Sequence, residues 1–90
     1  MRVPETNTND ALALRALVWT LSEQDRAMRL LDTTGLAPAD LRAGVGDPAT
    51  LGAVLAFLEA HEPDLIAAAA DLDTTPGALV RAREALEASR

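Results

Sequence analysis

Four prolines set the main limit on how this chain can fold. They stand in the pairs Ala37-Pro38, Asp47-Pro48, Glu62-Pro63 and Thr75-Pro76. Each pair is followed by apolar residues at the spacing of an α-helix. Proline is favoured in the first helical turn, because its φ is already helical and its missing N–H would have no partner there. Each pair therefore predicts the start of a helix.

Two further helix starts have polar caps instead of proline. Asn9 or Asp10 precedes an apolar segment, and Ser22 is followed by Asp25 at the spacing of a capping box. Gly35 is well placed to end a helix in the left-handed conformation. The sequence therefore predicts an all-α fold, a compact bundle of about six short helices. Their expected ranges are 10–22, 23–34, 38–45, 48–60, 63–72 and 76–88.

The length and composition fit one small helical domain. A chain of 90 residues can bury enough surface for a single modest core. Apolar residues make up 49% of it, and they are mostly Leu and Ala rather than the β-branched and aromatic residues that strands favour. We expect a flexible N-terminal tail over residues 1–9 and a single all-α domain over residues 10–90.

The two halves of the chain resemble each other. Expected helix starts near residues 10, 25 and 38 recur 38 residues later, near 48, 63 and 76. At this offset Leu17 corresponds to Leu55, and Trp19 to Phe57. The offset predicts an internal repeat of two three-helix units. Divergent duplication and regular helix packing both account for such a pattern.

The first and fourth expected helices are apolar on nearly all sides. Arg15 is the only charge inside the first, and the fourth has none before Glu59. Such helices are usually buried. Six short helices made mostly of Ala and Leu have limited area to cover both of them. We therefore expect apolar surface that binds an unidentified protein partner or a second copy of the chain.

Trp19 and Phe57 are the only aromatic residues, one in each of these two helices. Each lies far round its helix from the main apolar stripe. A large aromatic side chain in an Ala-Leu helix is either an anchor of the core or a binding hot spot at an interface. Both residues are therefore candidates for partner binding, and both alternatives stay open for each.

The charges argue against several classes of partner. The net charge is −6, which opposes nucleic acids and anionic membranes at long range. The longest apolar runs, 65–70 among them, are far shorter than the roughly 20 residues that span a bilayer. The N-terminus does not have the pattern of a signal peptide. All cations are Arg, which beside abundant Ala and Leu indicates a GC-rich bacterial genome, and we expect a cytoplasmic protein.

No set of residues points to an enzyme, a metal or a cofactor. The chain has no Cys, and its single His61 has no nucleophile among its sequence neighbours. Asp71 and Asp73 open like a calcium loop, but Pro76 and Ala82 stand where that loop needs Gly and Glu. We therefore predict that the protein is not an enzyme and needs no cofactor.

The stretch GLAPADLR, residues 35–42, has two structural interpretations. Leu36 and Leu41 have the spacing of a hydrophobic staple, which only joins two helices. The same spacing, repeated in residues 67–82 with Arg81 as a possible groove-facing cation, also fits a DNA-binding helix-turn-helix. A helix-turn-helix-like nucleic-acid-binding protein is therefore the alternative function, although the acidic charge leads us to expect no nucleic acid.

Two motifs give the chain a family resemblance. Residues 34–42 carry the turn T-G-L-x-P-x-x-L-R, and residues 53–58 carry the helix motif A-V-L-x-F-L. With them, residues 11–86 resemble a family of short alphaproteobacterial proteins catalogued only as a domain of unknown function. The chain departs from that family at Ala37, where an acidic cap is common, and in having no aromatic residue before Phe57 in the fourth helix. The resemblance implies an all-α protein without an assigned activity.

Together these features predict a non-enzymatic protein-protein interaction or adaptor module.

Because caps, prolines and apolar spacing agree on one set of helices, we expect a single cooperative unfolding transition and a helical circular dichroism spectrum. A chelator should leave the melting temperature unchanged. A noncooperative melt, or a clear fall of the melting temperature with the chelator, would contradict this prediction.

Overall fold

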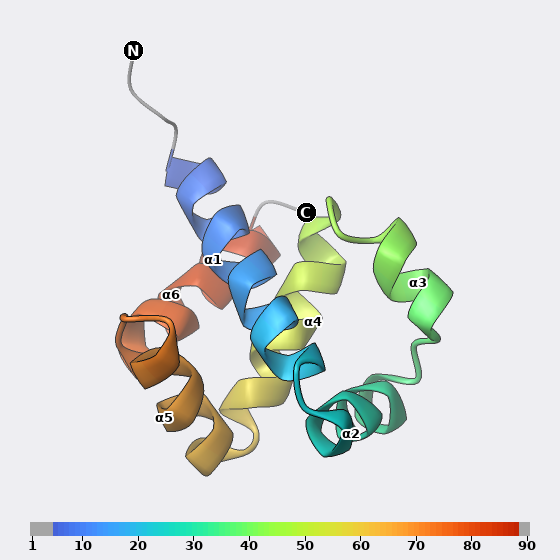
Figure 1. Cartoon of the computed structure of the whole chain (residues 1–90). Coiled ribbons are helices and arrows are strands. Elements are labelled where there is room, and N and C mark those ends of the chain that lie inside the picture. Colours follow the sequence, from blue (N-terminus) through green and yellow to red (C-terminus); the bar gives the residue numbers. More distant parts are fainter. Residues whose placement is uncertain (1–4, 89–90) are drawn as a thin grey trace.

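The structure, a computed structural model, describes residues 5–88, and the side chains of residues 9–88. It contains six helices (Figure 1), namely α1 (Glu5–Leu21), α2 (Gln24–Thr34), α3 (Pro38–Ala43), α4 (Pro48–Glu59), α5 (Glu62–Asp71) and α6 (Pro76–Ala88). No strand occurs between residues 5 and 88. The predicted all-α bundle is therefore confirmed.

The predicted helix starts agree closely with the observed ones. Pro38, Pro48 and Pro76 are the first residues of α3, α4 and α6, and α5 begins one residue before Pro63. Gly35 ends α2 with a φ of 74°, and its N–H donates to the carbonyl of Leu31 at 2.9 Å. This is the left-handed helix end that the sequence predicted.

The first helix begins earlier than the sequence predicted. It starts at Glu5, so residues 5–9, which we expected in the flexible tail, belong to α1, while residues 1–4 lie outside the described part of the chain. Residues 5–9 are all polar, so they carry no apolar pattern. A helix that has already formed extends by one hydrogen bond per residue, so it needs no such pattern to continue.

Ser22 has a different role from the predicted one. Its hydroxyl donates to the carbonyl of Trp19 at 2.6 Å, which closes the last turn of α1. The residue before α2 is Glu23, and it makes no capping hydrogen bond through its side chain. Ser22 therefore ends one helix instead of capping the next, and the predicted capping box with Asp25 was wrong.

The centre of the fold is α4. It packs against α1, α2, α5 and α6, which lie around it in Figure 1. Half of its twelve residues are buried, namely Leu51, Gly52, Val54, Leu55, Phe57 and Leu58. A helix that is apolar on nearly all sides thus has neighbours on most sides, as the sequence predicted for the fourth helix.

The other apolar helix, α1, is covered on one side only. Ala13, Ala16 and Leu17 face the core, whereas Val18 is 62% exposed. Some of the apolar surface of this helix therefore does remain uncovered. Since α1 and α4 occupy unequal positions, the internal repeat stays a prediction.

The third helix stands apart from the rest (Figure 1). It packs only weakly on the other helices, and Leu41 is its one buried residue. The N-terminal turn of α3 is closed locally, because the N–H of Ala37 donates to the carboxylate of Asp40 at 2.8 Å. The short α3 is thus formed by local interactions and attached to the core by one leucine.

The turn after α3 gives a test of this packing. A Cβ at Gly44 would lie 2.5 Å from Oγ1 and 3.0 Å from Cβ of Thr50, whereas a Cβ at Gly46 would meet nothing within 4 Å. We expect Gly44→Ala to lower the free energy of unfolding by about 1–3 kcal/mol, because rotation of Thr50 cannot clear its own Cβ. Gly46→Ala should change it by less than about 0.5 kcal/mol.

Denaturant unfolding followed by circular dichroism measures both values. The Thr50→Ala background is a further control, because it removes Oγ1 and Cγ2 but keeps Cβ, so it should relieve only the part of the cost that the first two atoms cause. Equal effects of the two alanine substitutions would show that the contact with Thr50 is not tight.

Candidate functional site

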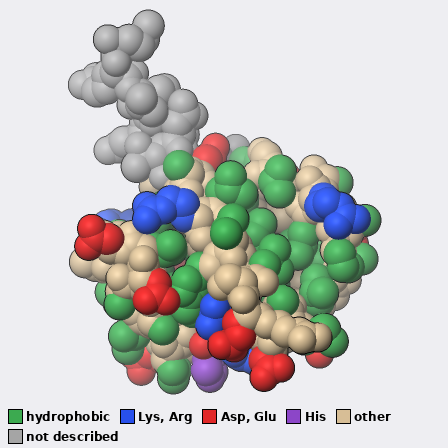
Figure 2. All heavy atoms as spheres, viewed as in Figure 1, with side chains coloured by type: hydrophobic (Ala, Val, Ile, Leu, Met, Phe, Trp, Pro, Cys, Tyr) green, Lys and Arg blue, Asp and Glu red, His purple; other side chains and the backbone are tan. Residues whose placement is uncertain are grey.

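Three apolar side chains form a ridge along the exposed side of α1. Leu14, Val18 and Leu21 are 41%, 62% and 43% exposed, and their spacing of four and three residues places them on one face of the helix. We call this set the α1 ridge. Figure 2 shows hydrophobic side chains over α1 and to its right, while most acidic side chains lie along the left and lower margins.

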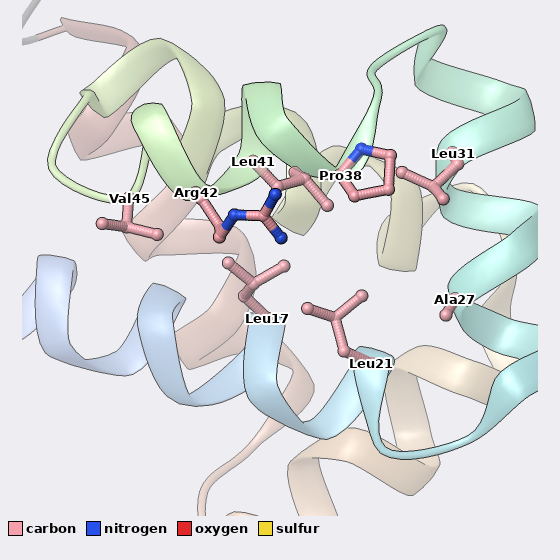
Figure 3. Close-up of a pocket in the computed structure, with 8 residues that line it drawn as sticks. All are labelled: Leu17, Leu21, Ala27, Leu31, Pro38, Leu41, Arg42 and Val45. Carbon is pink, nitrogen blue, oxygen red and sulfur yellow. The ribbon is translucent and has the colours of Figure 1, made fainter.

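An apolar hollow lies beside the ridge, between α1, α2 and α3 (Figure 3). We call it the α3 hollow, and its volume is about 280 Å³. Its lining consists of Leu17, Leu21, Ala27, Leu31, Pro38, Leu41, Arg42 and Val45. In Figure 3 apolar side chains from all three helices point toward one another around this space. The hollow exists because α3 stands away from α1 and α2.

A second hollow lies along the ridge, where α1 meets the turn after α5. We call it the Trp19 hollow, and its volume is about 520 Å³. Its lining consists of Leu14, Arg15, Val18, Trp19, Ser22 and Leu72. The ridge residues thus line both hollows, Leu21 on one and Leu14 with Val18 on the other. Ridge and hollows together form one apolar surface.

Trp19 is held firmly as a wall of its hollow. Its indole N–H donates to Oδ2 of Asp71 at 2.6 Å. The guanidinium carbon of Arg26 lies 3.7 Å from the centroid of the indole ring, a cation–π contact. Arg26 also donates through Nη2 to the carbonyl of Trp19 at 2.7 Å. The half-buried ring therefore has a fixed orientation, with one part packed on the core.

The second aromatic candidate lies elsewhere. Phe57 is a core residue of α4 with 6% of its surface exposed, and the guanidinium of Arg29 lies 6.0 Å from its ring centroid. Of the two residues considered for partner binding, the structure therefore places only Trp19 on the apolar surface. It leaves the ring of Phe57 little area for a partner.

Two arginines border the apolar surface. Arg15 lines the Trp19 hollow and Arg42 lines the α3 hollow, and no carboxylate lines either one. Arg15 donates to the carbonyl of Leu72 at 2.8 Å. Among the side chains of residues 9–88, neither arginine has a carboxylate partner, and Arg42 has no hydrogen-bond acceptor.

Other arginines are neutralised by carboxylates away from this surface. Arg29 pairs with Asp64 at 3.0 Å. Arg83 pairs with Glu59 and with Glu87, and hydrogen bonds to these carboxylates, Glu59 first, raise the pKa of its guanidinium. Arg15 and Arg42 thus differ from these paired arginines, and they share the lack of a carboxylate partner with Arg81, which lies on α6.

The remaining polar candidates do not assemble into a reactive site. Nδ1 of His61 lies 3.1 Å from Oδ2 of Asp64, in an exposed position. The described side chains, those of residues 9–88, include no group of three or more His, Asp or Glu able to hold a metal ion. The carboxylate of Asp71 accepts the hydrogen bond of the Trp19 indole. Arg81 is exposed on α6.

No helix in the described range is long and apolar enough to cross a membrane.

Sequence reasoning predicted that apolar surface would remain and named Trp19 as a candidate on it, but it did not identify the ridge or the two hollows. One local signal was present in α1, where the small residues Ala13 and Ala16 mark one face and Leu14 and Val18 the opposite one. Small residues permit close approach of a neighbouring helix, so they indicate the packed face. The hollows carried no such signal, because their lining comes from segments far apart in the chain.

The bond between Trp19 and Asp71 can be tested by substitution. We expect Asp71→Ala to lower the free energy of unfolding by about 1 kcal/mol, because the indole N–H loses its acceptor. Asp71→Asn should cost less, because the amide oxygen can still accept. Denaturant unfolding followed by the fluorescence of Trp19, the single tryptophan, measures the difference. Equal stability of all three proteins would contradict the role given to this bond.

Comparison with known proteins adds the family. No curated protein and no solved structure matches the chain. A family described as "Protein of unknown function (DUF3572)" matches residues 6–89, which is nearly the whole sequence. The resemblance to a domain of unknown function that the two motifs indicated is thus confirmed. The chain belongs to the DUF3572 family.

Proposed function

We propose that this protein is a non-enzymatic interaction module that binds a partner protein through the α1 ridge and the two hollows beside it. One observation carries this proposal. Leu14, Val18 and Leu21 remain between 41% and 62% exposed and are continuous with two hollows of largely apolar lining. Contiguous apolar surface of this kind is uncommon on a monomer and marks interfaces.

The fold itself does not require an apolar ridge. The opposite side of α1 makes the contacts with the core, through Ala13, Ala16 and Leu17. A polar residue at position 18 would fit the same helix without disturbing those contacts. The apolar character of the ridge therefore supports a role outside the stability of the isolated chain.

The arrangement also favours a protein partner over a small substrate. Both hollows are open to the ridge, and no acid-base pair lines either of them. The one hydroxyl in their lining, that of Ser22, donates to the carbonyl of Trp19 and has no general base beside it. A rigid aromatic wall with a neighbouring arginine is typical of binding hot spots. Trp19 and Arg15 supply these two groups in the Trp19 hollow.

Photo-crosslinking in the cells that produce the protein tests the proposal. A photoreactive amino acid replaces Val18 on the ridge, and the matched control replaces Glu84, which is exposed on α6. We expect a discrete covalent adduct from position 18 and none from position 84. The same adduct should be lost when Leu14→Asp is added, since a charge on the ridge opposes apolar contact. Absence of any adduct above the control would remove the ridge as an interface.

A further inference from the structure

We infer that the segment docking on this surface is an amphipathic helix whose apolar stripe is bordered by aspartate or glutamate. This inference rests on the proposed function and names the chemistry of the partner. It depends on the shape of the surface and on the two arginines that border it.

The shape fits side chains presented by a helix. The α3 hollow is an open space of about 280 Å³ between three helices, with aliphatic residues on each wall. Apolar side chains at positions i, i+3 or i+4, and i+7 of a partner helix can enter such a hollow together. The ridge beside it presents Leu21 and Val18 to the flank of the same helix.

The charges specify the residues around that apolar stripe. The chain has a net charge of −6, yet the charged residues on the two hollows are Arg15 and Arg42, both cationic. Neither has a carboxylate partner among the described side chains. In Figure 3 Arg42 lies among the apolar side chains of its hollow. A carboxylate beside the apolar stripe of the partner would complement each arginine.

Three other occupants fit these observations less well. A two-fold contact between copies would put the same two cations on both sides of the interface and would join two chains that each carry −6. An anionic membrane or a nucleic acid would be repelled by the same net charge, and two arginines are few for binding phosphates. An acidic helix is subject to the same long-range repulsion, but it carries few charges and can place them beside the two arginines.

Selection from a displayed library of helix-forming peptides tests the inference while the natural partner is still unidentified. Apolar, acidic and basic residues are randomised at every position, and the full chain serves as bait. We expect the enriched peptides to share an apolar stripe with adjacent Asp or Glu. Their Kd should rise about tenfold or more in the Arg15→Gln, Arg42→Gln double variant. Arg81→Gln, a matched change of an exposed arginine on α6, should leave Kd unchanged.

The Val18→Asp variant separates failure of the inference from failure of the proposed function. Circular dichroism first checks that each variant is folded. Selected peptides that bind Val18→Asp as well as the natural chain would overturn both. Two outcomes would overturn only the inference. In the first, the selected peptides need Val18 but lack acidic residues. In the second, their Kd is the same for the natural chain and for the Arg15→Gln, Arg42→Gln double variant.

Two further measurements exclude the competing occupants. If light scattering detects a dimer of the natural chain, we expect the Val18→Asp variant to form it equally well. Vesicles of phosphatidylglycerol should not bind the chain in a manner that depends on Val18, Arg15 and Arg42. A dimer that Val18→Asp removes, or such binding to vesicles, would replace the acidic helix by a second copy or by a lipid surface.

Discussion

The burial of α4 is the interaction on which the rest of this structure depends. Its apolar residues cover most of the circumference of the helix, so a stable fold must place neighbours on several sides at once. Four helices, α1, α2, α5 and α6, supply these neighbours. Because each neighbour offers one side to α4, the outer side of each is left to the solvent or to a partner. The exposed side of α1 carries three large apolar side chains, whereas α2 exposes Met28 and α5 exposes Ile66.

The small residues of α1 determine how that exposure arises. Ala13 and Ala16 are fully buried and let the helix approach the core closely, which turns the larger Leu14 and Val18 outward. The weakly attached α3 then stands beside the ridge without covering it. The surface that we propose for binding thus lies at the edge of a well-packed core, so contact with a partner would not require the core to change.

The preference for an acidic partner that we propose for the apolar surface follows from the placement of charges. Several carboxylates are engaged elsewhere, as helix caps at Asp40 and Asp47 or as the ion pairs of Glu59 and Asp64. The side chains that line the apolar surface include two arginines and no carboxylate, and the carboxylate beside it, that of Asp71, accepts the hydrogen bond of the Trp19 indole. In our proposal, long-range repulsion by the net charge disfavours most anionic partners, while short-range attraction by the two arginines favours a partner with acidic groups in matching positions.

The sequence by itself determined the helices, and the tertiary structure decided which of their faces are free. Prolines, caps and Gly35 act within a few residues, so the helix starts and the absence of strands between residues 5 and 88 could be predicted from local rules. The helical start at Glu5 could not, because helix extension leaves no apolar pattern. Trp19 and Phe57 occupy corresponding positions on similar helices, yet one borders a hollow and the other is in the core. Periodicity assigns a residue to a face of its helix, but only packing decides whether a neighbour covers that face.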